Sequence, residues 1–117
     1  MKRLDCYLRT HRRQWGLSQR ELSHLLGLKD RSLLSLLEKA QRAPTLHIAL
    51  ACETLFGVTA KELFPKFYGQ VTDALMRRAL VQHKRLERED SSHAKTKRIL
   101  LQDAQRRAAE STSEQTV

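Results

Sequence analysis

Apolar residues, mostly Leu and Ala, recur at three- and four-residue spacing along most of this chain, with polar and charged residues between them. This spacing is typical of amphipathic helices. Ser18-Gln-Arg-Glu21 and Thr59-Ala-Lys-Glu62 each match a capping box, in which a hydroxyl at the N-cap and a Glu three residues later satisfy free backbone N–H groups. Two helix starts are therefore predicted, at residues 18 and 59.

Further N-cap and helix-ending residues predict a set of five short helices before residue 65. Asp30 and Thr45 are N-cap candidates, and the first of them predicts a helix from Arg31 to about Lys39. Gly27 and Gly57 are expected just past helix ends, and Pro65 is expected to close the fifth helix. The helix after Thr45 is apolar around most of its circumference, which predicts that it is buried.

Beyond Pro65 the apolar spacing predicts longer helices. Apolar positions predict one long amphipathic helix over 67–88, a polar break at 89–92 and a further helix over about 95–109. Residues 111–117 lack apolar periodicity and are expected to be disordered. The predicted fold is all-α, with a five-helix domain at 1–65, a helical extension at 66–110 and a tail at 111–117.

Composition supports this organisation. The 117 residues include only four Gly and two Pro, few for an all-β fold. The longest apolar run, Ile48 to Cys52, is far shorter than a membrane span, and charged residues interrupt the segment where a leader would need an apolar stretch. The chain is therefore expected to be cytoplasmic, without a membrane partner.

The formal charge of +9 favours a polyanionic partner, with nucleic acid first and an acidic membrane second. No P-loop, metal-ligand spacing or nucleophile motif is present, so no enzyme activity, cofactor or metal is expected. Cys6 and Cys52 are interpreted as small core residues. The Arg12-Arg13 pair is interpreted as a solvated helix face, and Glu38 and Glu53 as helix-surface or loop-anchoring residues.

Residues 4–65 resemble a known family. A two-turn capped helix, a turn at Gly27 and a helix with small polar residues at its start outline a helix-turn-helix. The sequence is similar to the Cro and phage-repressor type, the XRE family, at Leu8-Arg9, Arg12, Gly16-Leu17-Ser18-Gln19, Glu21-Leu22, Leu25-Leu26-Gly27, Ser35, Glu38, Pro44, Phe56-Gly57-Val58 and Glu62-Leu63-Phe64. The resemblance implies a DNA-binding regulator, expected to be a repressor that binds double-stranded DNA as a homodimer.

A recognition helix places its N-terminal residues at base edges in the major groove. Between Gly27 and Glu38 the chain has one residue more than the family spacing, which we place in the turn at Lys29-Asp30. The base-reading candidates are then Asp30, Arg31, Ser32, Ser35 and Leu36. The phosphate-binding candidates are Ser18, Gln19, Arg20, Lys29, Lys39 and Arg42, of which Gln19 resembles the family's phosphate-contacting glutamine.

Alternatives remain at two places. Leu33 and Leu36 stand where the family tends to carry polar residues, so this face either contacts thymine methyl groups or binds a protein. The second reading leaves open an adaptor that no longer reads bases. A separate alternative is an antitoxin, which keeps the DNA-binding fold and adds a protein partner. Val71, Leu75 and Leu80 are candidates for dimerisation, unless the helix over 67–88 folds back on its own five-helix domain.

Overall fold

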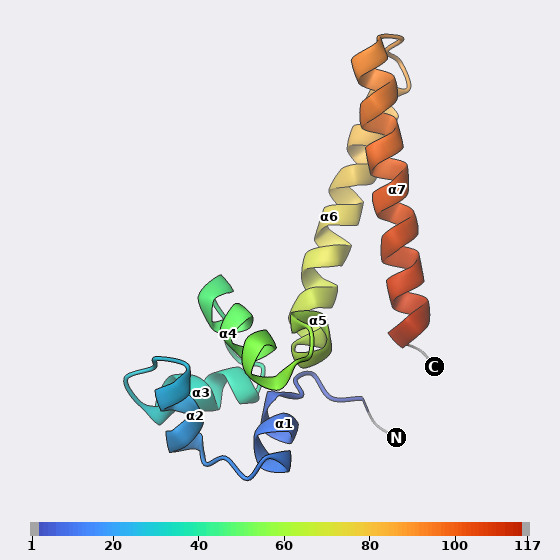
Figure 1. The fold of residues 1–117 in the computed structure, drawn as a ribbon. Coiled ribbons are helices and arrows are strands. Elements are labelled where there is room, and N and C mark those ends of the chain that lie inside the picture. The colour runs from blue at the N-terminus through green and yellow to red at the C-terminus, as the bar shows by residue number, and fades with distance from the viewer. Residues whose placement is uncertain (1–2, 116–117) are drawn as a thin grey trace. The chain divides into compact units, whose positions relative to one another are not determined.

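The computed structural model describes residues 3–115, with side chains described up to residue 111. The described part is all-helical, which confirms the predicted fold class (Figure 1). In chain order the helices are α1 (Leu8–Gln14), α2 (Gln19–Leu25), α3 (Arg31–Glu38), α4 (Leu46–Phe56), α5 (Ala60–Leu63), α6 (Pro65–Leu86) and α7 (Ser92–Gln115).

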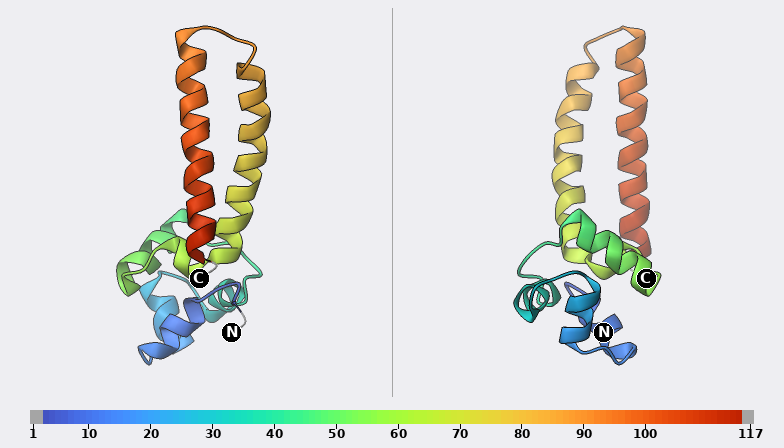
Figure 2. Two further views of the ribbon diagram at one scale, coloured as in Figure 1. Left: turned by 90° about the vertical axis from the view of Figure 1, so that its right-hand side faces the viewer. Right: turned by 60° about the vertical axis from the view of Figure 1, so that its left-hand side comes forward.

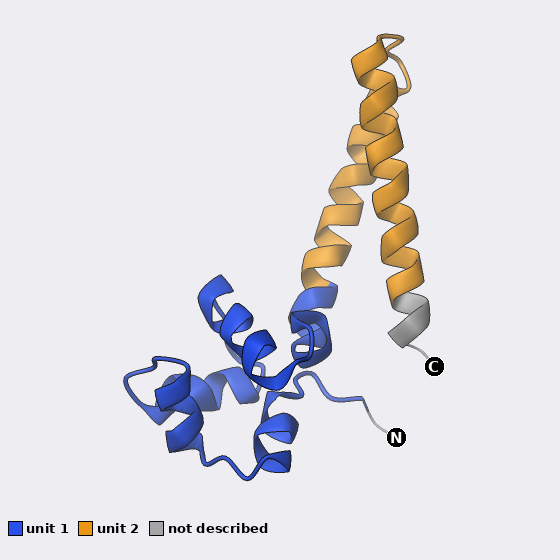
Figure 3. Ribbon diagram, viewed as in Figure 1, with its two compact units in different colours: residues 1–69 blue, residues 70–117 orange. Residues whose placement is uncertain are grey.

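The chain divides into two compact units, Met1–Gly69 and Gln70–Val117 (Figure 3). The division falls within α6, four residues beyond the boundary predicted at residue 65. Unit 1 contains the five short helices and the first residues of α6, and unit 2 contains the rest of α6 together with α7.

Unit 1 is built around completely buried aliphatic side chains. Leu8, Leu22, Leu34, Leu37 and Leu63 have no exposed surface, and they come from α1, α2, α3 and α5, with Leu34 and Leu37 both on α3. Cys6 and Cys52 are free, buried members of the same core, as expected. Burial raises the pKa of the Cys52 thiol to about 12 and also raises the pKa of Cys6. Both thiols are therefore protonated and unreactive near neutral pH.

Backbone hydrogen bonds join the start of the chain to the end of unit 1. The Tyr7 amide donates to the Leu63 carbonyl at 2.8 Å, and the Lys66 amide donates to the Asp5 carbonyl at 3.3 Å. The Lys66 ammonium also donates to the Ala40 carbonyl at 3.1 Å, beyond the end of α3. These contacts fix the start of α1 and the end of α3 against the end of α5 and the start of α6.

The predicted caps are present where the sequence places them. The Thr45 hydroxyl accepts from the Ile48 amide at 3.3 Å, and the Thr59 hydroxyl accepts from the Glu62 amide at 3.1 Å. Gly57 ends α4 with a left-handed φ of 70°, a conformation that favours glycine. The Glu53 carboxylate accepts from the Ala60 amide at 2.6 Å, so Glu53 anchors the α4–α5 loop.

Two expectations for this region are wrong. The helix α4 is not buried all round, because Leu46 and Leu50 are 71% and 51% exposed while Ile48 and Cys52 face the core. Pro65 does not close α5, which ends at Leu63, but is the first residue of α6. A proline has no N–H to satisfy and its fixed φ suits the first helical turn, so one residue type fits both a stop and a start.

Unit 2 is an antiparallel helical hairpin, with α6 and α7 side by side (Figures 1 and 2). Among the described residues of this unit three side chains are buried, and two of them are alanines: Ala79 and Leu86 on α6 and Ala94 on α7. At the closed end the Arg98 guanidinium donates to the carbonyls of Leu86 and Glu89. Arg98 therefore pins the turn between the two helices.

The second hairpin helix is longer than predicted. The Ser91 hydroxyl accepts from the Ala94 amide at 3.1 Å, so α7 begins at Ser92 rather than near residue 95. The helix continues to Gln115, which corrects the expected disordered tail for residues 111–115; residues 116 and 117 lie outside the described part. No helix in the described part combines the length and apolar character that crossing a membrane requires.

Candidate nucleic-acid interface

The first helix of the predicted pair, α2, begins with a complete capping box. The Ser18 hydroxyl accepts from the Glu21 amide, and the Glu21 carboxylate accepts from the Ser18 amide, each at 3.0 Å. The hydrogen bond from the Ser18 backbone N–H to the carboxylate is the main cause that lowers the pKa of Glu21 from its usual value, and the Ser18 side chain adds to it. The Ser18 hydroxyl is thus already engaged in starting the helix.

The turn after α2 is short and is set by one glycine. Gly27 has a left-handed φ of 73°, just past the C-cap residue Leu26. The Leu28 amide then donates to the Ser23 carbonyl at 2.8 Å. The Asp30 carboxylate accepts from the Ser32 amide at 2.9 Å and caps α3. Asp30 therefore has the structural role of an N-cap, whatever else it contacts.

The next helix, α3, has a buried side and an exposed side. Leu34, Leu37 and Glu38 are buried, and Leu33 is partly buried against the core. The exposed side consists of residues three or four apart, Ser32, Leu36 and Lys39, with Ser35 half-buried between them and Arg31 exposed at the start. The base-reading candidates on α3 thus share its outer side.

A buried ion pair holds the inner side of α3 against α1 and α2. The Arg12 guanidinium donates to the two oxygens of Glu38, at 2.6 Å from Nε and 3.2 Å from Nη2. It also donates to the Leu17 carbonyl at 2.9 Å, and the Gln19 amide donates to Glu38 at 3.0 Å. Arg12 is only 8% exposed, so its interpretation as part of a solvated face is wrong.

This network was missed by sequence reasoning. Arg12 and Glu38 lie 26 positions apart, and neither helix alone indicates that they meet. The available signal was that both belong to the set of residues that resemble the family. Its physical consequence is that Gln19, the first residue of α2, is held in place by a side chain of α3.

The four cationic phosphate candidates fall into two groups, apart from Ser18 and Gln19 at the start of α2. Arg20 and Lys29 line one shallow hollow of about 190 Å³ at the end of α2 and the start of α3, together with Ser23, His24, Leu28, Asp30 and Arg31. The exposed Lys39 and Arg42 are not part of this hollow. The Ser23 hydroxyl is buried in the same place and has no hydrogen-bond partner within the described part of the chain. Cationic side chains and a free hydroxyl therefore surround the start of α3.

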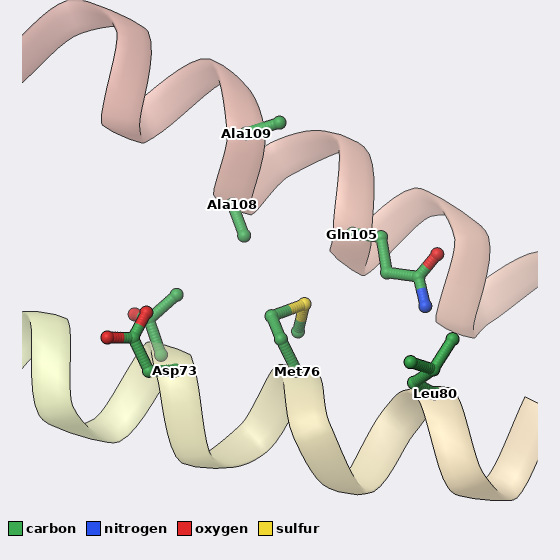
Figure 4. Close-up of a pocket in the computed structure, with 7 residues that line it drawn as sticks. Asp73, Met76, Leu80, Gln105, Ala108 and Ala109 are labelled. Carbon is green, nitrogen blue, oxygen red and sulfur yellow. The ribbon is translucent and has the colours of Figure 1, made fainter.

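The three dimerisation candidates do not share one side of α6. Val71 and Leu75, one turn apart, are 67% and 52% exposed. Leu80 is five residues beyond Leu75, about 140° further around the helix at 3.6 residues per turn. Leu80 lines the space of about 400 Å³ between α6 and α7, with Met76 and Gln105 (Figure 4). The predicted stripe is thus divided between two sides of the helix.

Comparison with known proteins identifies the first unit. Residues 8–63 match a family model described as Helix-turn-helix, a little under half of the chain. This confirms the resemblance to the Cro and phage-repressor type, a family of DNA-binding regulators rather than of enzymes, and α2 and α3 lie within the match. No curated protein and no solved structure matches the chain. The hairpin of unit 2 lies outside the matched residues.

Proposed function

Because residues 8–63 form a helix-turn-helix domain of a DNA-binding family, we propose that this chain is a cytoplasmic repressor that occupies an operator sequence as a dimer. In this proposal α3 is the recognition helix and enters the major groove with its N-terminal residues at the base edges. The observation that carries it is the division of α3 into a buried side and a polar, basic outer side.

The outer side of α3 has the chemistry for reading bases. Arg31 is exposed and can bond N7 and O6 of guanine in a bidentate manner, worth about 1–3 kcal/mol of discrimination. Ser32 can donate or accept, and Leu36, 37% exposed, offers methyl groups to thymine. Asp30 keeps one oxygen on its own helix and has a second oxygen able to accept from cytosine.

Phosphate contacts position such a helix without reading sequence. Gln19 stands at the N-terminus of α2, where free backbone N–H groups favour an anion. Arg20 and Lys29 are exposed beside the start of α3, and Lys39 and Arg42 lie at and beyond its end. In this proposal these residues contact phosphates near the two ends of α3.

Dimerisation through the hairpin is supported by its open apolar surface. Val71 and Leu75 are exposed on one side of α6, and the space between α6 and α7 is not filled by their own side chains (Figure 4). A single helix-turn-helix unit reads only a few base pairs, and two copies on half-sites about 10–10.5 bp apart supply the remaining specificity. We therefore assign Val71 and Leu75 to the dimer contact.

The adaptor alternative receives less support. It needs Leu33 and Leu36 together as an apolar contact surface, but Leu33 packs against the core of unit 1. Leu36 alone is exposed on the outer side of α3. A protein partner of the antitoxin kind remains compatible with the proposal, because it adds a contact without removing DNA binding.

Selection from a randomised DNA pool tests the proposal, at about 0.15 M salt because non-specific affinity depends steeply on salt. The wild-type chain is compared with the double variant Arg31→Ala, Ser32→Ala. The matched control Arg9→Ala, Thr10→Ala removes the same charge and one hydroxyl from the exposed side of α1. Wild type and control are expected to enrich an inverted repeat, and the α3 variant to lose it. Equal binding of all sequences by all three proteins would overturn the proposal.

A further inference from the structure

The side of α6 that faces away from α7 is strongly basic. Arg77, Val81 and Lys84 recur at three- and four-residue spacing with Arg85 adjacent to them, and Arg88 follows in the turn just after the helix; all five are exposed. The side toward α7 carries Ala79, His83 and Leu86 instead. We call the five exposed residues the outer α6 face. It lies in unit 2, outside the helix-turn-helix match.

The positive charge of the outer α6 face is not neutralised by an ion pair within the described part of the chain, although Glu89 lies next to Arg88 in the chain. Asp73, the only carboxylate within α6, lines the space toward α7 (Figure 4). Glu87 contacts the His83 ring at 3.4 Å, and Asp90 pairs with Lys95 at 3.6 Å. No ion pair joins Arg77, Lys84, Arg85 or Arg88 to a carboxylate of the described residues. These four cations are available to a partner.

The same residues form a concave surface. Val81, Lys84, Arg85 and Arg88 line a hollow of about 360 Å³. Long basic side chains place their stems along apolar surface while their charged ends reach outward. The hollow therefore presents several cations to one ligand, which suits a polyanion better than a single small anion.

Spacing and composition indicate which polyanion fits. From Arg77 to Arg85 the face extends about 12 Å along the helix axis, and a DNA strand presents one phosphate per about 3.4 Å of its axis. A membrane-surface helix would instead need large apolar residues to insert, with its apolar side free. Here the face carries only Val81, and the opposite side of α6 packs on α7.

We propose that the outer α6 face is a second DNA-binding surface, which contacts phosphates of double-stranded DNA without reading sequence. It goes beyond the operator recognition proposed for α3, because it needs no base contact and lies in the other unit. Lys84, Arg85 and Arg88 each neutralise a phosphate, so the face adds affinity and salt dependence but no sequence preference.

The test measures binding of the full chain to a labelled duplex of arbitrary sequence by fluorescence anisotropy, between 50 and 200 mM salt. The variant Lys84→Gln, Arg85→Gln, Arg88→Gln is compared with the control Lys95→Gln, Lys97→Gln, Arg107→Gln. The control removes the same charge from scattered exposed positions of α7. All six residues are exposed, and circular dichroism is expected to show both variants folded as wild type.

Three lost phosphate contacts should lower the slope of log K against log salt by about 2.7, which makes affinity about 40-fold less salt-sensitive over this range. The control should change the slope by less than 1. Equal changes of the slope in both variants would mean that only net charge matters. An unchanged slope in the α6 variant would mean that the outer α6 face does not contact DNA. Either result overturns the proposal. Loss of binding to phosphatidylserine vesicles with unchanged DNA binding would overturn it in favour of a membrane.

The two proposals can fail separately. In the pool selection the α6 variant should enrich the same motif as wild type, because it keeps α3 intact. If wild type enriches no motif but the α6 variant loses salt dependence, operator recognition fails and the second surface stands. If the motif is enriched and the slope is unchanged, the reverse holds.

Discussion

Unit 1 buries five leucines completely, whereas unit 2 buries only Ala79, Leu86 and Ala94 and leaves Val71, Leu75, Leu80, Val81, Ile99 and Leu100 more than half exposed. Burial of apolar surface contributes about 25 cal/mol per Å², so the two units differ greatly in what holds them together. Unit 1 has its own interior, a buried ion pair and capped helices. Unit 2 has a turn held by Arg98 and a few buried side chains between its two helices. The comparison shows that unit 1 has a filled interior of its own, whereas unit 2 has open apolar surface that the proposed dimer would cover.

The largest effect is expected from breaking the ion pair of unit 1. Glu38→Ala leaves the Arg12 guanidinium buried without its carboxylate, and should lower the free energy of unfolding by about 3–5 kcal/mol. Urea unfolding followed by circular dichroism measures this. The exposed-site control Glu89→Ala should change it by less than about 0.5 kcal/mol. A loss below about 1 kcal/mol for Glu38→Ala would show that the pair does not hold α3.

The next largest effect tests the proposed dimer contact of unit 2. Leu75→Asp places a charge in the proposed dimer contact and should raise the dimer dissociation constant at least about 100-fold, or about 2.7 kcal/mol. Sedimentation measures this, with unit 1 remaining folded. The control is Ile99→Asp, at an exposed apolar position of α7. A Leu75→Asp chain that stays dimeric would exclude this side of α6 as the contact.

A smaller effect separates the two roles of Asp30. Asp30→Ala removes the N-cap of α3 and should cost about 1 kcal/mol, whereas Asp30→Asn keeps an acceptor and should cost little. Thermal unfolding of both variants measures the cap. If the Asn variant keeps stability but changes the preferred base at one operator position, Asp30 reads a base as well as capping the helix.

The smallest effect is a pH dependence that only unit 1 should show. Burial raises the pKa of Cys52 to about 12 and also raises that of Cys6, so the unfolded chain releases these protons first. The contribution is fully present below the ordinary thiol pKa and is lost as pH rises toward 12, with a loss of about 1 kcal/mol at pH 9.5 from the two thiols together. Urea unfolding at pH 7 and 9.5 measures it. The double variant Cys6→Ala, Cys52→Ala should lack this dependence; an equal loss there would assign it to other groups.

What the sequence predicted depends on how local the determining interactions are. Capping at Ser18, Asp30, Thr45 and Thr59 rests on residues two or three positions apart, and each of these caps is present. The Arg12–Glu38 contact joins residues 26 positions apart and could not be read from either helix. The exposure of Leu46 and the burial of Leu33 depend on how helices pack, which apolar spacing alone does not determine.

The candidate site divides in the same way. Placing the extra residue in the turn at Lys29-Asp30 puts Arg31, Ser32 and Ser35 on α3, and the structure has them on its outer side or at its start. Apolar spacing alone predicts one stripe on α6, and it does not separate Val71 and Leu75 from Leu80. The position of α7 decides which of them face the inside of the hairpin.

The hydrogen bond from Gln19 to the buried Glu38 fixes the Gln19 side chain before any DNA is bound. A free glutamine at a helix start samples several rotamers, and fixing one on binding costs about 0.5–1.5 kcal/mol of conformational entropy. Here the hydrogen bond at 3.0 Å selects the rotamer when the domain folds, and the amide nitrogen keeps a second hydrogen to donate. The side chain is thus preorganised for its proposed phosphate. Folding, rather than DNA, would set its geometry.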